Sequence, residues 1–250
     1  MQSTVLTIAG SDSSAGAGIQ ADLATFARFG VNGASAITAI TAQNARGVIA
    51  WGAVEPELVR AQIDAVDQVD AVKTGMLANA AIVATVAEAI TRRGLRPYVL
   101  DPVTIAGTGH ALARDDLTPL ILDHLVPLAD LVTPNLGEAQ AMTGAPVRNI
   151  EEMALAALAL MQRGARAVLI KGGHLNGDLV TDLLCDSSGV RYFQRPRINV
   201  GTHGTGCRLS AAIAASLALG APLDAAVEAG GQFVHEFISG QFIAGLRSDG

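Results

Sequence analysis

Charged side chains are scarce in this sequence of 250 residues: they make up 16% of it, whereas an average soluble domain has about 25%. Seventeen basic and 23 acidic residues give a net charge of −6, so there is no excess of cations to neutralise a phosphate backbone. This balance argues against a nucleic-acid partner. Half of the residues are apolar, which excludes a disordered chain, and the length predicts one large α/β domain over residues 1–250.

The sequence also has only two cysteines, no n-region of an export signal, and no apolar run long enough for a membrane span. Cys185 and Cys207 are the only cysteines and form no C-x-x-C motif, which indicates a reducing compartment without a disulfide or a thiolate metal site. No basic residue precedes Arg28, so the n-region of a signal peptide is missing. The longest apolar stretch, residues 209–223, is shorter than the ~18 residues that a membrane span needs. We expect a cytoplasmic protein with no membrane partner.

Several common catalytic motifs are missing too. The two lysines, Lys73 and Lys171, do not stand in G-x-x-x-x-G-K, which excludes a Walker A loop, and no G-x-S-x-G marks a hydrolase nucleophile. The five histidines form no H-x-x-x-H pair, so a zinc site has little support. Lys73 lies near the end of one predicted strand and Lys171 directly follows another, and a lysine at a strand end reaches bound phosphate. Lys171 is the better candidate because two glycines follow it, whereas a salt bridge explains Lys73 equally well.

Strands and helices alternate along the chain. Short β-branched and apolar runs predict strands at 4–9, 34–41, 71–74, 98–100, 131–133 and 167–170. Apolar residues at helical spacing predict helices at 16–29, 56–69, 79–93, 115–125, 151–164, 207–220 and from about 222 onward. This order predicts a mostly parallel sheet with helices on both faces. A Ser-Ser-Gly turn between residues 179–184 and 190–194 predicts a hairpin that adds an antiparallel edge.

A glycine- and serine-rich loop, residues 10–18, separates the first strand from the first helix. Residues 16–21 match G-x-G-x-x-A, which favours a dinucleotide site. However, the match begins about six residues after the strand, and Gln43 and Asn44 stand where an acidic ribose partner is expected. Two other interpretations remain open: glycines that only permit a tight backbone, or a loop that binds a small polar ligand with help from Asp22.

The strongest local signal is Gly204-Thr205-Gly206-Cys207 at the start of an alanine-rich helix. Free backbone N–H groups at a helix N-terminus, with glycines that give access, form a site for an anion. The same positive end is expected to favour the thiolate of Cys207, which makes it a candidate base or nucleophile. The alternative is a buried structural cysteine, and Cys185, in an apolar strand, fits that description.

Three oxygen-bearing side chains follow predicted strands. Asn135 and Glu138 lie three positions apart on an opening helix turn, where they either hold hydrated Mg²⁺ or form a capping box. Asp101 directly follows the strand at 98–100, the position of a carboxylate that faces a metal or a phosphate. A buried turn aspartate is the alternative for Asp101.

Seven motifs, in unchanged order from residue 4 to about 220, resemble the hydroxymethylpyrimidine and phosphomethylpyrimidine kinases of thiamine biosynthesis. They are TIAGSDSSAGAGIQADLATF, AITAITAQN, VKTGML, VLDPV, TPNLGEA, VLIKGGH and THGTGCRLSAAIA. The resemblance implies the ribokinase-like fold, a three-layer α/β sandwich. It also implies ATP as co-substrate, Mg²⁺, a small pyrimidine substrate and a homodimer.

On the pyrimidine side, the resemblance implies contacts from the backbone at Gly10 and around Met76. The Asp22 carboxylate would hold the hydroxymethyl group, and the Gln43 amide would read the aminopyrimidine edge with its paired donor and acceptor. A pyridoxal kinase is the nearest alternative enzyme, because related proteins with cysteine in the 204–207 turn accept vitamin B6 aldehydes. A pyrimidine-binding module without transfer activity is the alternative from another class.

On the nucleotide side, the resemblance implies Asn135 and Glu138 for Mg-ATP, Lys171 near the phosphates, and Thr202 beside the 204–207 turn. Within that turn Cys207 takes the catalytic position, where sugar kinases of the same fold carry aspartate.

Two departures from the family pattern affect the phosphate side. Gly107 stands where the family usually has lysine, and Arg208 replaces the usual threonine after the catalytic cysteine. We expect the Arg208 guanidinium to supply the missing cation at the ATP site. The change puts the second phosphorylation, which must hold more substrate charge, in question.

Overall fold

The computed structural model describes residues 2–44, 47–103, 116–173, 175–198 and 204–240. Three expectations fall outside these ranges: Thr202 as an ATP contact, Gly107 as a lost lysine position, and the first residue of the helix predicted at 115–125.

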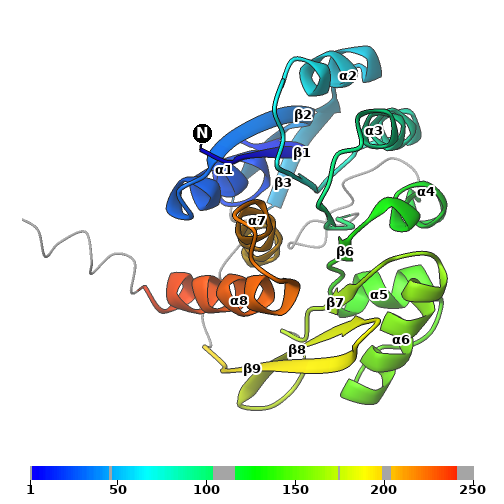
Figure 1. Cartoon of the computed structure of the whole chain (residues 1–250), viewed down its shortest axis with the longest axis vertical. Helices are drawn as coiled ribbons and strands as arrows, with labels where there is room; N and C mark the ends of the chain where they lie inside the picture. The colour runs from blue at the N-terminus through cyan, green and yellow to red at the C-terminus, as the bar shows by residue number, and fades with distance from the viewer. Residues whose placement is uncertain (1, 45–46, 104–115, 174, 199–203, 241–250) are drawn as a thin grey trace, which may run out of the picture.

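A single nine-stranded sheet, in the order β3-β2-β1-β4-β5-β6-β7-β8-β9, organises the described part of the chain (Figure 1). The strands are β1 (Thr4–Asp12), β2 (Asn32–Asn44), β3 (Gly47–Ala53), β4 (Ala71–Thr74), β5 (Tyr98–Leu100), β6 (Leu131–Val132), β7 (Val168–Ile170), β8 (Leu179–Asp186) and β9 (Gly189–Pro196). The six strands from β2 to β7 in this order run parallel, which confirms the predicted parallel sheet.

Both edges of the sheet are antiparallel. The predicted hairpin is confirmed as β8 and β9, and β8 pairs antiparallel with β7. At the other edge β3 pairs antiparallel with β2, a strand that the sequence pattern did not reveal. Its apolar residues mark a core face only weakly: Val48 and Trp51 pack against the core, but Ile49 is 76% exposed, and glycines stand at positions 47 and 52.

Helices cover both faces of the sheet, as predicted (Figure 1). One face carries α1 (Gly18–Arg28), α7 (Thr205–Ala218) and α8 (Leu223–Ser239), and the other carries α2 (Pro56–Asp64), α3 (Ala80–Arg93), α4 (Thr118–His124), α5 (Leu136–Thr143) and α6 (Ile150–Gln162). A short 3₁₀ turn, Val126–Leu128, follows α4. The helix predicted over 56–69 ends earlier, at Asp64, because Val66 and Val69 pack against the core as the chain approaches β4.

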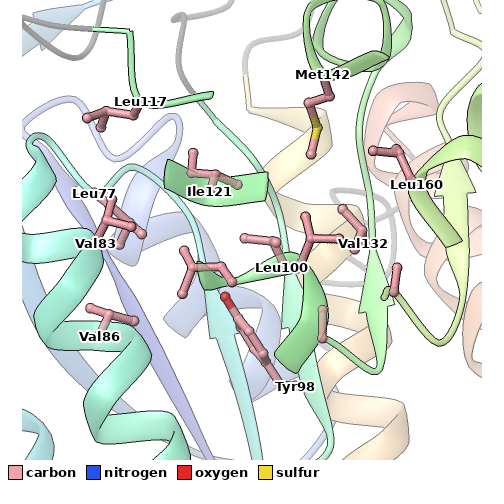
Figure 2. Packing of buried hydrophobic residues seen from close by; sticks show 14 of the residues in the cluster. Leu77, Val83, Val86, Tyr98, Leu100, Leu117, Ile121, Val132, Met142 and Leu160 are labelled. Atoms are coloured by element: carbon pink, nitrogen blue, oxygen red, sulfur yellow. The ribbon is translucent and has the colours of Figure 1, made fainter. Parts of the chain in front are cut away.

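Alternation along the strands divides the core into two layers. In β1, Val5 belongs to the layer under α1, α7 and α8, while Leu6 and Ile8 belong to the opposite layer. Figure 2 shows part of that opposite layer, where Tyr98 lies among aliphatic side chains. The Tyr98 hydroxyl is hydrogen-bonded to Thr74 Oγ1 at 2.8 Å, which satisfies its polar end inside the core.

The order in which the chain adds strands to the sheet reverses at β1. From β1 it proceeds to β2 on one side, and β4 then lies on the other side of β1. Ligands of open α/β sheets bind at the carboxyl ends of strands near such a point. The end of β1 and the loop that follows it (residues 10–18), the segment after β4, and the residues after β5, β6 and β7 therefore meet at one edge. No helix in the described ranges has both the length and the apolar character for a membrane span.

Candidate active site

Asp12 organises the glycine loop from within. Its carboxylate accepts hydrogen bonds from the backbone N–H of Ser14 (2.9 Å) and of Ala17 (2.8 Å). Gly18 has φ of +60°, and a Cβ there would lie 2.4 Å from the carbonyl oxygen of Gly10. The loop is thus folded tightly on itself, which confirms that its glycines permit close backbone contact. Sequence reasoning missed Asp12, although an aspartate before Ser-Ser at the end of a strand is a typical Asx-turn signal.

The glycine loop contacts the N-terminus of α7 directly. Gly204, the N-cap residue of α7, has φ of +77°, and a Cβ on it would lie 2.0 Å from the carbonyl oxygen of Gly16. Arg208 Nη1 donates a hydrogen bond to the same oxygen at 2.6 Å. The structure therefore joins the predicted substrate loop to the predicted phosphate turn, although 192 positions separate Gly16 from Arg208.

Cys207 lies between two helix N-termini. It is in the first turn of α7 and is partly exposed, and the backbone N–H of Gly18, where α1 begins, is near enough to lower the pKa of its thiol. Burial raises the pKa of the Cys207 thiol, and the nearby Lys73 ammonium opposes the rise. The raised pKa runs against the expectation that the helix N-terminus favours the thiolate at rest, and desolvation by burial is its largest cause.

Asp22 forms a fully buried ion pair below the loop. Its Oδ2 accepts hydrogen bonds from Lys73 Nζ at 2.7 Å and from Thr7 Oγ1 at 2.6 Å, whereas Oδ1 has no hydrogen-bond partner among the described residues. Burial raises the pKa of the Asp22 carboxyl, and Lys73 opposes this. The salt-bridge interpretation of Lys73 is confirmed. The predicted contact between Asp22 and the hydroxymethyl group remains a prediction.

The other predicted pyrimidine contacts gather around the same loop. Gln43, at the end of β2, donates from Nε2 to Asp12 Oδ2 at 3.3 Å and from its backbone N–H to Ser13 Oγ at 2.9 Å. Gly10 lies against Met76, whose sulfur would be 2.8 Å from a Cβ at that glycine. The carboxyl ends of β1, β2 and β4 thus place Gly10, Gln43 and Met76 together.

The nucleotide-side residues form a second cluster, centred on Lys171. Lys171 Nζ lies 2.8 Å from Asp101 Oδ1 and 3.8 Å from Glu138 Oε2. A Cβ on Gly206 would lie 3.3 Å from the same Nζ, so Lys171 is next to the α7 turn. Ser210 Oγ donates to Asp101 Oδ2 at 3.0 Å; this buried serine was missed, since one turn beyond Cys207 it looks like an ordinary helix residue.

Asn135 and Glu138 form a capping box. Asn135 Oδ1 accepts from the backbone N–H of Glu138 at 2.9 Å, and Glu138 Oε2 accepts from the backbone N–H of Asn135 at 2.7 Å. The capping interpretation is confirmed and leaves the Mg²⁺ role open. Burial raises the pKa of Glu138 to about 6, although Lys171 lowers it. Asp101 is buried as well, but Lys171 holds the pKa of its carboxyl below the usual range.

The donor set suits a hydrated magnesium ion rather than an all-protein cage. No group of three or more His, Cys, Asp or Glu side chains in the described ranges is arranged to hold a metal. Two carboxylates, Asp101 and Glu138, lie near one another beside Lys171. Mg²⁺ is usually bound through one or two carboxylates, with water and substrate phosphates as its other ligands, and these two residues fit that pattern.

Arg208 has a different environment from the one we expected. Its guanidinium carbon lies 4.1 Å from the centroid of the Phe237 ring in α8, and Nη1 is bonded to the carbonyl of Gly16. The side chain thus faces the glycine loop and α8. A role at the phosphates of ATP stays a prediction, whereas the contact with the loop is part of the structure.

A parallel sheet covered by helices, with lysines, a glycine-rich loop and a helix N-terminus gathered at the carboxyl ends of its strands, is typical of α/β enzymes that handle phosphate. Residues 12–248 match the family model described as phosphomethylpyrimidine kinase, and the chain belongs to that family. It is 51% identical over 244 residues to the hydroxymethylpyrimidine/phosphomethylpyrimidine kinase of Rhizobium meliloti, covering 96% of this chain and 91% of that protein. Its identity to the Bacillus subtilis kinase of the same name is 44%, over 93% of this chain and 88% of the relative.

Solved structures support the same assignment. Phosphomethylpyrimidine kinase from Clostridium difficile superposes with a TM-score of 0.85 at 38% identity, covering 95% of this chain and 100% of that one. An ADP complex of Bacillus subtilis pyridoxal kinase gives a TM-score of 0.87 at 35% identity, covering 93% and 90%. These likenesses confirm the predicted ribokinase-like sandwich and a nucleotide-binding kinase family.

Proposed function

We propose that this enzyme transfers the γ-phosphoryl group of ATP to 4-amino-5-hydroxymethyl-2-methylpyrimidine, and then to the monophosphate to give the diphosphate, in thiamine biosynthesis. The observation that carries the proposal is the direct contact between the glycine loop at Gly16 and the α7 turn at Gly204. This contact holds an alcohol-binding loop beside an anion-binding helix N-terminus. The curated relatives carry both kinase activities in their names.

Positioning and charge neutralisation supply most of the catalysis in this mechanism. Phosphoryl transfer passes through a loose transition state, so the enzyme chiefly aligns the alcohol oxygen with the γ-phosphorus and stabilises negative charge. The amides of the turn 204–207 bind the γ-phosphoryl oxygens, and Lys171 lies beside that turn. Asp101 and Glu138 are the residues that would hold Mg²⁺, which supplies further neutralisation of phosphate charge when bound.

Cys207 accepts the proton of the attacking alcohol. Because burial keeps the thiol protonated at rest, it must first lose its proton to solvent water; the thiolate then takes the alcohol proton as the new O–P bond forms and the bond from phosphorus to the ADP oxygen breaks. The Gly18 N–H and the Lys73 ammonium stabilise that thiolate. A base with a raised pKa holds the transferred proton firmly, which favours transfer from the poorly acidic alcohol.

A second candidate substrate is pyridoxal, because pyridoxal kinases are among the structural neighbours, with TM-scores of 0.87 for the Bacillus subtilis enzyme and 0.86 for a Staphylococcus aureus complex with AMP-PCP and pyridoxal. The experiment that separates the candidates measures ADP formation with the hydroxymethylpyrimidine, its monophosphate and pyridoxal, each with and without Mg²⁺. We expect the two pyrimidines to be phosphorylated only with Mg²⁺. Tight pyrimidine binding without ADP formation would instead indicate a binding module.

We also propose that the enzyme works as a cytoplasmic homodimer. Apolar side chains that a second copy of the chain would cover lie on the β2–β3 edge, where Ile40 is 62% and Ile49 is 76% exposed. Sedimentation equilibrium at micromolar concentration tests the assembly, and a mass of one chain, 25.5 kDa, would exclude the dimer.

A further inference from the structure

We propose that Arg208 is a positioning residue that fixes the glycine loop, and the pyrimidine alcohol bound there, against the start of α7. Its Nη1 donates to the carbonyl oxygen of Gly16 at 2.6 Å and, more weakly, to that of Gly204 at 3.3 Å. One guanidinium therefore holds the loop and the phosphate turn together. Only the identity of the bound alcohol rests on the proposed function; the contact itself does not.

The third anchor of the guanidinium is α8. The Phe237 ring lies 4.1 Å from its central carbon, and the residue as a whole is only 9% exposed. Arginine is almost never this buried unless its planar head is paired, and stacking on an aromatic face fixes the plane of the guanidinium. The orientation that bonds Gly16 is thus set by a helix outside the site described above.

The loop needs this external anchor because its internal bonds leave out Gly16. Asp12 binds the backbone N–H groups of Ser14 and Ala17, on either side of that glycine. Gly18 follows Gly16 by two residues, and its backbone N–H lies near the Cys207 thiol and lowers the pKa of that thiol. A displacement of Gly16 would therefore carry the Gly18 amide away from the catalytic sulfur and move the alcohol relative to the γ-phosphorus.

This role differs from that of a cation placed on the phosphates. An anchor of the loop acts equally on the alcohol and on its monophosphate, because both occupy the same pyrimidine site. A phosphate-binding cation acts mainly on the monophosphate, the more highly charged substrate. The two roles are therefore separated by the ratio of kcat/KM for the two pyrimidines.

The test combines hydrogen exchange with kinetics in Arg208→Thr, which restores the residue usual in the family. We expect amide exchange in residues 13–18 to become about tenfold faster, since a charge-assisted bond is lost. The KM for each pyrimidine should rise by about tenfold, by the same factor for both, with the KM for ATP changed by less than about twofold.

Two variants of Phe237 keep the proposal testable should Arg208→Thr fail to fold. Phe237→Ala removes the stacking partner and leaves the charge, so it should speed loop exchange and raise the pyrimidine KM in the same direction by about threefold. Phe237→Tyr keeps the aromatic ring and should leave the loop exchange rate and the pyrimidine KM at their wild-type values. Arg163→Ala, which removes an arginine from an exposed ion pair with Asp123, is the matched control and should leave both readouts unchanged.

Two results would overturn the proposal: unchanged exchange in residues 13–18 in Arg208→Thr and Phe237→Ala, or a loss of activity confined to the monophosphate. The exchange measurement needs no substrate. A wild-type protein that forms no ADP with either pyrimidine would therefore refute the proposed function, while faster loop exchange in the variants would still support the anchor.

Discussion

At the level of single residues, the proposed mechanism depends on Cys207, a thiol in the first turn of α7 near the Gly18 amide. Cys207→Ala should lower kcat by about 10²–10⁴-fold, the usual contribution of a general base, with the KM for ATP almost unchanged. Steady-state kinetics with the hydroxymethylpyrimidine measures this. Cys185→Ala is the control, because that thiol lies in β8, inside the core, and its loss should reduce stability but not turnover. Wild-type turnover in Cys207→Ala would remove this residue from the mechanism.

The buried Lys73–Asp22 ion pair should affect the free energy of unfolding. Both side chains have no exposed surface, so Lys73→Met leaves the Asp22 carboxylate without its cation and should lower the free energy of unfolding by about 3–5 kcal/mol. Adding Asp22→Asn should recover part of the loss, since the second change removes the stranded charge. Urea denaturation measures both.

The matched control for this pair is the exposed one between Arg92 and Asp64, 2.5 Å apart. Arg92→Ala should cost no more than about 1 kcal/mol, because water screens that pair. Equal costs for Lys73→Met and Arg92→Ala would contradict the importance of burial.

At the scale of elements, a glycine with positive φ stands at each end of α7, and the two positions can be compared. Gly204 precedes the helix with φ of +77°, and a Cβ on it would collide with the carbonyl oxygen of Gly16; Gly220 follows the helix with φ of +85° and has open space around it. Gly220→Ala should cost about 1 kcal/mol of stability through the left-handed backbone, and Gly204→Ala should cost more, because the collision with Gly16 adds to the same backbone strain.

Only Gly204→Ala should also reduce catalysis, by about 10²-fold in kcat/KM, because it pushes the glycine loop away from α7. Kinetics of the two variants side by side tests this. If Gly220→Ala lost as much activity as Gly204→Ala, helix strain rather than loop displacement would explain the effect.

Elements with a buried face were predictable from the sequence, and elements without one were not. β5 alternates between the two core layers, with Tyr98 and Leu100 on one side and Val99 on the other, and its predicted bounds match the structure. By contrast, β3 lies at the edge, where Val48 and Trp51 are only partly buried and Ile49 is exposed, so the hydrophobic pattern was too weak to predict it. Its strand character comes from pairing with β2, a tertiary interaction.

For the whole molecule, the composition of the site was predictable, but its internal pairings were not. Gly204, Cys207, Lys171, Asp101 and Glu138 follow strands or open helices, and local sequence shows that. The bond from Arg208 to Gly16 joins residues 192 positions apart and depends on how α7 crosses the sheet. The thiol pKa likewise depends on burial by the assembled core, which reversed the expectation drawn from the helix N-terminus alone.

The free energy of unfolding should depend on pH through Glu138, because burial raises the pKa of its carboxyl from 4.5 to about 6. The folded state then holds this proton more tightly than the unfolded state, so the free energy of unfolding falls as pH rises from about 4.5 to 6 and is constant above that. Glu138→Gln keeps an oxygen for the capping box and removes the titration. Its stability relative to wild type should therefore increase through this window by on the order of 1–2 kcal/mol.

Urea denaturation at half-unit steps from pH 4.5 to 7 measures that difference. Because Mg²⁺ near Glu138 favours the carboxylate, adding Mg²⁺ and ADP should shrink the difference between the two proteins in the same window. If the stabilities of wild type and Glu138→Gln changed in parallel with pH, the carboxyl would not titrate near 6, and its burial beside Lys171 would carry no energetic penalty for the ionised form.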